Sequence, residues 1–145
     1  MDKEQYITDR LEVQINWYNK KSIKNQRWFR WLQVITIILS ISIPFLSGYE
    51  RNTPELQFVI GVLGLIVAVF TGILGVFQFQ KHWLEYRATC EALKREKYLF
   101  LTGAEPYNSE DAFALLVDTT EGIMLQENTN WKNYMIKAKK NVTPG

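Results

Sequence analysis

The stretch that decides the fold is Leu56–Phe79, LQFVIGVLGLIVAVFTGILGVFQF, which runs for 24 positions without a charged side chain. As an α-helix rising ~1.5 Å per residue it reaches ~36 Å, which exceeds a hydrocarbon core of ~30 Å. A strand or helix in the core of a soluble protein rarely stays uncharged over such a length. The stretch 56–79 therefore predicts a transmembrane helix.

A second apolar segment, WLQVITIILSISIPFLSG, covers 31–48 and is also uncharged over its 18 residues. A helix of this length reaches ~27 Å, just enough to span. A signal peptide is the competing interpretation, but 30 residues with acidic and basic side chains precede the segment and no small-x-small cleavage site follows it. We therefore expect a second transmembrane helix at 31–48.

The basic residues are distributed unevenly around these two segments. Seven Lys and Arg precede the first span, Arg51 alone lies in the link, and nine follow the second span. Because loops rich in Lys and Arg stay in the cytoplasm, this predicts a multi-pass protein of the cell membrane with both termini cytoplasmic. The link 49–55, with Asn52, Thr53 and Pro54, then forms a short outer turn.

The composition argues against catalysis. The chain has one histidine, His82, and one cysteine, Cys90, so the common catalytic sets and a Cys-rich metal site cannot be assembled. We expect no enzyme activity, no cofactor and no metal. A net charge of +2 is also too small to indicate a nucleic-acid partner.

Two of the water-exposed segments are predicted to prolong the spans as helices. The N-terminal helix, 1–30, lacks proline and glycine and should run straight into the first span. The helix 80–102 should continue from the second span until Gly103 ends it.

The last segment, 108–140, has the pattern of an amphipathic helix, capped by Asn108 or Ser109. Its apolar face needs a partner and falls within an arc of roughly 120° at 100° per residue. That face consists of Phe113, Leu116, Val117, Thr120, Ile123, Met124, Trp131, Tyr134 and Met135. The predicted fold is thus all-α: a two-span helical hairpin whose helices extend into a cytoplasmic helical bundle.

Small residues gather on one side of the second span and form what we call the small-residue stripe. They lie within an arc of about 100° on a helix, and their spacing allows helix backbones to approach closely. The stripe can pack against the first span of the same chain or between subunits around an axis, and both interpretations stay open. Its members are Gly61, Gly64, Ala68, Gly72 and Gly75.

Polar residues gather on one side of the first span and form the polar stripe, within an arc of about 80°. Such hydroxyl groups can bond to carbonyls one turn earlier, or they can line a water-filled path for ions. Two helices cannot enclose such a path alone, so conduction would require a homo-oligomer. The candidate pore-lining residues are Gln33, Thr36, Ser40, Pro44 and Ser47.

Basic residues also cluster immediately before the first span. Their simplest role is to set topology and to attract anionic membrane lipids, and a charged vestibule of a pore is the alternative. The cluster comprises Lys20, Lys21, Lys24, Arg27 and Arg30.

Three motifs in the chain together resemble the SLATT superfamily of small bacterial proteins with two transmembrane helices, which includes branches known only as domains of unknown function. The likeness covers nearly the whole chain, from about residue 6 to residue 131. The motifs are Tyr6-x3-Arg10-Leu11-x2-Gln14-x2-Trp17-Tyr18-x2-Lys21-Ser22, Trp83-x2-Tyr86-Arg87-x3-Glu91-x-Leu93-x2-Glu96 with Leu101-Thr102-Gly103, and Glu121-x-Ile123-x3-Glu127-x3-Trp131.

The resemblance implies a pore-forming effector of a bacterial conflict system in the inner membrane, with a separate sensor protein as a possible partner. The alternative is a non-conducting scaffold or adaptor that recruits a partner through its cytoplasmic helices. In either case the motif residues would hold the cytoplasmic bundle together, with aromatic rings in its core and long charged side chains as their partners. This predicted set is Arg10, Gln14, Trp17, Tyr18, Trp83, Tyr86, Arg87, Glu91, Glu96 and Trp131.

Overall fold

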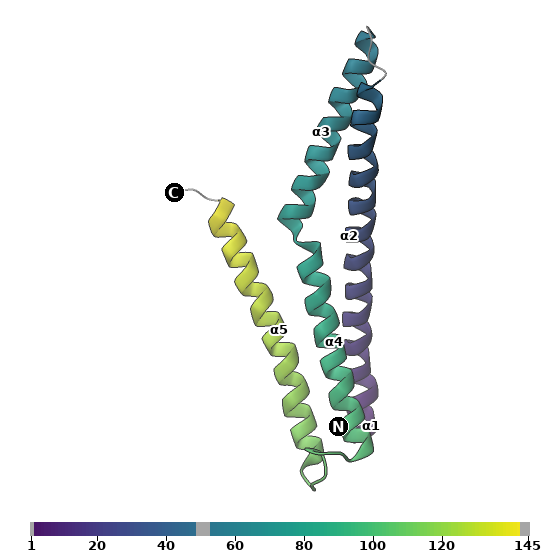
Figure 1. The fold of residues 1–145 in the computed structure, drawn as a ribbon. Coiled ribbons are helices and arrows are strands. Elements are labelled where there is room, and N and C mark those ends of the chain that lie inside the picture. The colour runs from purple at the N-terminus through teal and green to yellow at the C-terminus, as the bar shows by residue number, and fades with distance from the viewer. Residues whose placement is uncertain (1, 49–52, 143–145) are drawn as a thin grey trace. The chain divides into compact units, whose positions relative to one another are not determined.

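A computed structural model describes residues 2–48 and 53–142, and in this part of the chain it contains helices and turns but no strand. The predicted all-α class is therefore confirmed. Most of the predicted outer turn, 49–52, and the end of the chain, 143–145, lie outside the described residues. The elements are α1 (Lys3–Tyr6), the π-helical turn η1 (Ile7–Leu11), α2 (Glu12–Ser47), α3 (Pro54–Phe77), α4 (Phe79–Thr102) and α5 (Ala112–Val142), and Figure 1 labels the α-helices.

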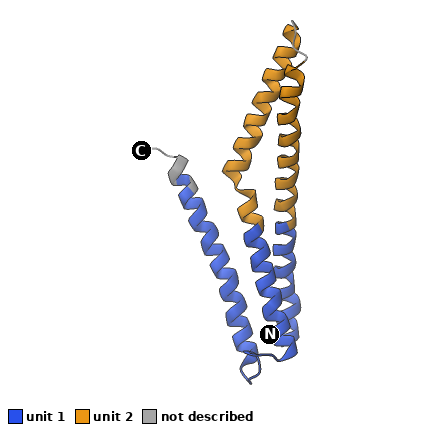
Figure 2. Cartoon of the chain, viewed as in Figure 1, with its two compact units in different colours: residues 1–22, 84–145 blue, residues 23–83 orange. Residues whose placement is uncertain are grey.

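The helices belong to two compact units, drawn in different colours in Figure 2. Unit 1 comprises residues 1–22 and 84–145, and unit 2 comprises residues 23–83. The described part of the chain has two helical stretches that are long and apolar enough to cross a membrane, Lys3–Ser47 and Pro54–Thr102. The predicted span 56–79 lies within the second stretch, and the predicted span 31–48 lies within the first except for its last residue, Gly48.

The core of unit 1 is built from the N-terminal segment, α4 and α5. Leu11, Leu93 and Leu116 are fully buried. One cluster of buried side chains joins the three segments, and a second cluster lies at the α4–α5 connection around Tyr107. The first cluster comprises Tyr6, Leu11, Ile15, Tyr18, Cys90, Leu93 and Met124.

The π-helical turn η1 sets the face that the N-terminal segment presents to this core. In an α-helix, five residues advance by about 500°, so Leu11 would lie about 140° away from Tyr6. The wider turn, closed by the Glu12 N–H that donates to the Ile7 carbonyl, accommodates the extra residue. Tyr6 and Leu11 are therefore both buried in the same cluster.

In unit 2, half-buried residues follow a helical period on each apolar helix. On α2 they include Leu32, Thr36, Leu39, Ile43 and Leu46. On α3 they include Leu56, Ile60, Leu63, Val67, Phe70 and Leu74. Intervals of three and four residues place each set on one side of its helix. The covered side of α3 is therefore made of large aliphatic and aromatic side chains.

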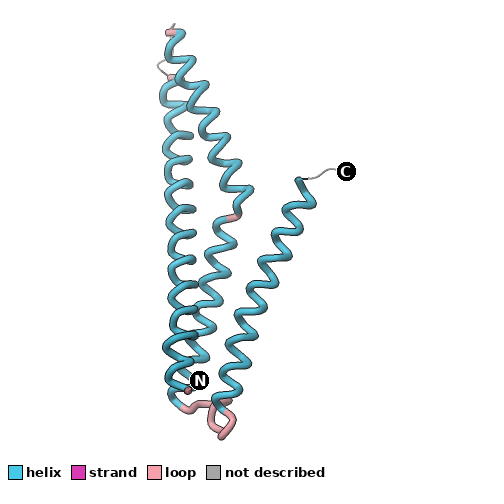
Figure 3. The backbone as a smooth tube through the Cα atoms, turned by 180° about the vertical axis from the view of Figure 1, so that it is seen from behind, coloured by secondary structure: helices cyan, strands magenta, loops and turns pink. Residues whose placement is uncertain are grey.

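Two boundaries differ from the sequence prediction. The helix expected to continue through 80–102 is interrupted at Gln78, visible as a short loop in Figure 3. Gln78 adopts the left-handed conformation (φ 44°), which ends α3 as a C-cap residue does. The last helix begins at Ala112 rather than at 108, because a turn in which Ala112 N–H donates to the Ser109 carbonyl precedes it.

Candidate functional site

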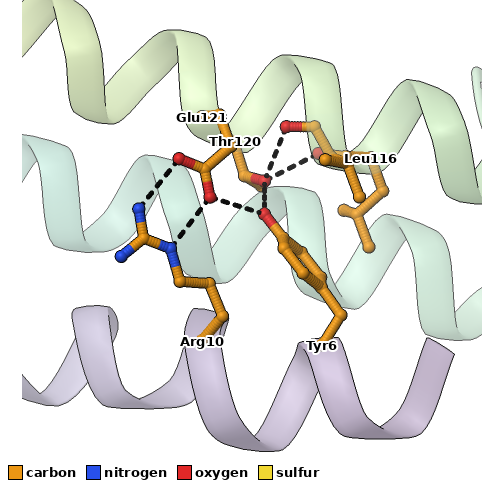
Figure 4. Close-up of polar contacts among 6 residues, drawn as sticks. Tyr6, Arg10, Leu116, Thr120 and Glu121 are labelled. Atoms are coloured by element: carbon orange, nitrogen blue, oxygen red, sulfur yellow. Dashed lines mark hydrogen bonds and ion pairs between the residues drawn. The ribbon is translucent and has the colours of Figure 1, made fainter. Parts of the chain in front are cut away.

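A polar cluster joins the N-terminal segment to α5 inside unit 1 (Figure 4). Arg10 extends from η1 and donates from Nε and Nη2 to both carboxylate oxygens of Glu121, each at 2.9 Å. The Tyr6 hydroxyl lies 2.9 Å from the Thr120 hydroxyl and donates to Glu121 at 3.2 Å. A two-pronged ion pair of this kind fixes the orientation of both helices as well as their distance.

These contacts change the acidity of the groups involved. The hydrogen bond from Arg10 holds the pKa of the Glu121 carboxyl below its ordinary value. Burial raises the pKa of the Tyr6 hydroxyl, so that it stays protonated as a donor. Glu121 is therefore a charged carboxylate with a charged partner.

Glu127, six residues further along α5, has the opposite environment. Its carboxylate accepts a hydrogen bond from the Tyr18 hydroxyl at 3.2 Å, and among the described residues it forms no ion pair. Burial raises the pKa of this carboxyl, and the negative charge of Glu85 raises it further. Among the described residues, this partly buried acid is therefore paired with a neutral hydroxyl group and not with a cation.

Aromatic rings surround the Tyr18–Glu127 contact. The Trp17 ring meets Tyr18 edge to face at a centroid distance of 5.0 Å and meets Tyr86 in the same way at 6.0 Å. Tyr18 is buried, whereas 44% of the Trp17 surface is exposed. Three of the predicted bundle residues are therefore brought together at one place.

The other predicted bundle residues are distributed over unit 1, except Trp83, which belongs to unit 2. Arg87 and Glu91 form an exposed pair at 3.0 Å on α4. Glu96 accepts a hydrogen bond from the Tyr107 hydroxyl at 2.6 Å. Burial, and to a smaller extent this hydrogen bond, raise the pKa of the Tyr107 hydroxyl to about 12. The remaining three differ in exposure: Gln14 and Trp83 are half-buried and Trp131 is exposed.

The hydroxyl groups of the polar stripe bond to their own helix. The Thr36 hydroxyl donates to the Leu32 carbonyl and the Ser40 hydroxyl to the Thr36 carbonyl, each at 2.7 Å. Thr36 is half-buried, and the other four members, Gln33, Ser40, Pro44 and Ser47, are exposed in the single chain. The helix continues through Pro44 to Ser47. Each bonded hydroxyl oxygen keeps lone pairs that can accept from water or face a cation.

The small-residue stripe of α3 is almost entirely uncovered in the single chain. Gly61, Ala68, Gly72 and Gly75 are exposed. A Cβ atom added at Gly61, Gly64, Gly72 or Gly75 would meet no heavy atom within 4 Å. On a helix the stripe is centred about 120° from the covered side of α3. The close packing for which such residues are suited is therefore absent within one chain.

No grouping of three or more His, Cys, Asp or Glu side chains suited to a metal ion occurs in residues 2–48 and 53–142. Cys90 is buried, and its Sγ donates to the Ile15 carbonyl at 3.6 Å. Burial raises the pKa of the Cys90 thiol, which disfavours the nucleophilic thiolate.

A protein family described as "Protein of unknown function (DUF4231)" matches residues 13–113, more than half of the chain. The chain belongs to the DUF4231 family. Searches of curated proteins and of solved structures gave no match.

The DUF4231 region covers the uncharged apolar segments 31–48 and 56–79, all of α4 and the first two residues of α5. Trp17, Tyr18 and Tyr86 lie inside it. Of the polar groups that contact one another between the N-terminal segment and α5, Tyr18 lies inside the region, Arg10 precedes it, and Glu121 and Glu127 follow it. The family match therefore includes both apolar segments and α4 but few of the polar groups that contact α5.

Sequence reasoning did not include Glu121, Glu127 or Thr120 among the bundle residues, although two of them occur in the third motif. One signal was available for Glu127. At 100° per residue it falls within 20° of Thr120, in the middle of the apolar face of the last helix. A carboxylate at the centre of an apolar face indicates a specific partner, here the Tyr18 hydroxyl.

Neutralising Glu121 and neutralising Glu127 should change the stability of the protein at pH 7 in opposite directions. The lowered pKa of Glu121 means that its contribution to stability is present above about pH 4.5 and is lost as the pH falls through the folded-state value. The raised pKa of Glu127 means that its contribution is present below about pH 4.5 and is lost as the pH rises through the folded-state value.

Glu121→Gln should therefore lower the unfolding free energy by about 0.5–1 kcal/mol at pH 7, a modest loss because both partners of the ion pair are partly exposed. Glu127→Gln should raise the Tm at the same pH, since the amide keeps the hydrogen bond from Tyr18 and removes the unpaired charge. Thermal unfolding of both variants from pH 4 to pH 8 measures the effect. Tm changes of equal sign would contradict the assignment of the two environments.

Proposed function

We propose that this DUF4231 chain is a two-span protein of the bacterial inner membrane that assembles into a homo-oligomer and forms an ion-permeable pore. Both termini would lie in the cytoplasm, with the spans as a helical hairpin and unit 1 as the cytoplasmic bundle. The proposal is consistent with the likeness to the SLATT superfamily. Within that setting the chain would act as a membrane effector rather than as an enzyme.

The observation that carries the proposal is the combination of exposed apolar side chains with an uncovered small-residue stripe. Large side chains such as Ile41, Phe58 and Val76 are 64%, 74% and 79% exposed in the single chain. A water-soluble monomer rarely exposes contiguous apolar surface of this extent, whereas lipid tails would cover it. The stripe on α3 then supplies a surface on which a second copy can pack closely.

The polar stripe of the first span is the proposed lining of the path. Thr36 and Ser40 direct their protons to backbone carbonyls, so their oxygens would face the path as acceptors, an arrangement that favours cations over anions. The two spans contain no ionisable residue, which argues against a charged selectivity ring or a proton relay at membrane depth.

Removal of these hydroxyl groups should lower cation flux severalfold. The test is potassium flux from liposomes that contain either the wild type or the Thr36→Val/Ser40→Ala variant, together with the oligomeric mass in nanodiscs. Ser42→Ala is the matched control, because Ser42 also bonds to a carbonyl one turn earlier, that of Ile38, but lies outside the polar stripe. Unaltered flux in the double variant would reject the lining, and a strictly monomeric protein would reject the pore.

A non-conducting scaffold is the second candidate, and the part of α5 from Leu125 onward favours it. Apolar side chains there are exposed although unit 1 has its own core: Leu125, Trp131, Met135 and Ile136 are 67%, 41%, 55% and 56% exposed. A scaffold predicts liposomes that do not leak and co-purification with a partner protein that these residues bind. Persistent flux by the purified protein alone would exclude it.

A further inference from the structure

A groove of about 440 Å³ lies in unit 1 between the N-terminal helix and α5. This volume is within the range of small-molecule sites, roughly 300–1,000 Å³. The groove is lined by aromatic, amide, thioether and charged side chains, and we call it the Glu127 groove. Six of its lining residues are Gln14, Trp17, Tyr18, Met124, Glu127 and Asn128.

The charge at one end of the groove is unbalanced. In the part of the chain that the structure describes, Glu127 accepts a hydrogen bond from Tyr18 on one of its two carboxylate oxygens. The charged neighbour that acts on it, Glu85, carries the same sign. The guanidinium of Arg10, which also lines the groove, is held by two bonds to Glu121. A carboxylate in this situation attracts a cation from outside the chain.

The aromatic wall suits the same kind of ligand. Trp17 is 44% exposed, and the Nζ atom of Lys21 lies 5.4 Å from the centroid of its ring, so the indole already takes part in one cation–π contact. Met124, next to Tyr18 in the core cluster, adds an apolar surface against which an alkyl chain can pack.

We propose that the Glu127 groove binds a small organic cation, a primary ammonium or guanidinium group on a short apolar chain. The cationic group rests on the Glu127 carboxylate and the alkyl chain packs along Trp17 and Met124. The amide carbonyl oxygens of Gln14 and Asn128 can accept hydrogen bonds from the remaining N–H groups of the cation. Inorganic cations lack the alkyl chain that packs along Trp17 and Met124.

The test measures the binding of butylguanidinium chloride to the full-length protein in nanodiscs, by calorimetry and by the rise in Tm that a bound ligand causes. Sodium chloride at equal ionic strength and neutral 1-butanol are the comparison solutes. We expect saturable binding of butylguanidinium and no comparable rise in Tm with either comparison solute.

Glu127→Gln should weaken butylguanidinium binding by about tenfold or more, because the charge-assisted contact is lost while the hydrogen bond from Tyr18 remains. Asp118→Asn removes the same charge from an exposed position of α5 and should bind as the wild type does. Trp17→Leu, a change at a partly exposed position, should weaken binding severalfold.

Each Tm rise is measured against that variant's own Tm, which separates binding from stability. The proposal is overturned if Glu127→Gln binds butylguanidinium as tightly as the wild type. An equal loss of affinity in Asp118→Asn, or an equal Tm rise with sodium chloride, also overturns it, because either result would reduce the effect to general screening of negative charge.

Discussion

Replacement of Gly64 and Gly72 by leucine should dissociate the proposed oligomer while the single chain stays folded. A Cβ atom at either glycine meets no heavy atom within 4 Å, so a side chain can leave the backbone at both positions without a clash at its first atom in the monomer. In a close-packed contact between two helices, by contrast, each leucine would separate the backbones that the glycines allow to approach. Leucine is also a better helix former than glycine and more apolar, so the change should not weaken membrane insertion.

The measurement is the mass of the protein in nanodiscs, together with the helical content and Tm. Val62→Leu/Val69→Leu is the matched control, because these two exposed residues lie on α3 outside the small-residue stripe and the change adds bulk there instead. An oligomer of unchanged mass in Gly64→Leu/Gly72→Leu would show that the stripe is not the contact between subunits. Loss of potassium flux together with loss of the oligomer would link assembly to conduction.

The sequence predicted the all-α class and the positions of the two apolar helices because both depend on local signals. The uncharged run at 56–79 and the helical period of the last segment are each readable within a few turns. The two interpretations of the small-residue stripe could not be separated in this way. In the structure, the covered side of α3 contains Leu63, Val67 and Phe70, whereas most of the glycines are exposed. This difference in burial cannot be derived from the sequence, because both sides of the helix are apolar.

Two features of the backbone could not be predicted from the sequence. The π-helical turn at Ile7–Leu11 inserts a residue into an unremarkable helical pattern, and it is stabilised by tertiary burial of Tyr6 and Leu11 rather than by a local residue preference. The interruption at Gln78 places a non-glycine residue in the left-handed conformation, which sequence rules assign mainly to glycine and asparagine.

The pairing of charges was equally hard to predict. The sequence offers Arg10 many acidic candidates, and the bidentate contact with Glu121 depends on how η1 faces α5. The pair Arg87–Glu91 was predictable because both residues lie on one helix at an interval of four. Sequence spacing therefore identifies contacts within a helix, and the contacts between helices that define the Glu127 groove require the fold.

Leu93→Ala should destabilise unit 1 more than any other change considered so far. Leu93 is fully buried in the cluster with Leu11 and Met124, so the shortened side chain leaves a cavity where three helical segments meet. The expected loss is about 3 kcal/mol of unfolding free energy. For a domain of this size that corresponds to a Tm lower by roughly 12–24 °C.

Leu101→Ala is the matched control, because Leu101 lies on the same helix with 57% of its surface exposed and should change the stability little. Amide hydrogen exchange locates the effect: in Leu93→Ala, protection should fall in residues 3–22 and in the first half of α5 together, since both segments depend on one core. Protection in α3 should not change, because its side chains belong to unit 2. A loss of protection confined to α4 would show that the three segments do not fold as a cooperative unit. The oligomeric mass should be unchanged in Leu93→Ala, because the proposed subunit contact lies on α3. An unchanged mass would show that the assembly surface is distinct from the core that positions Glu127.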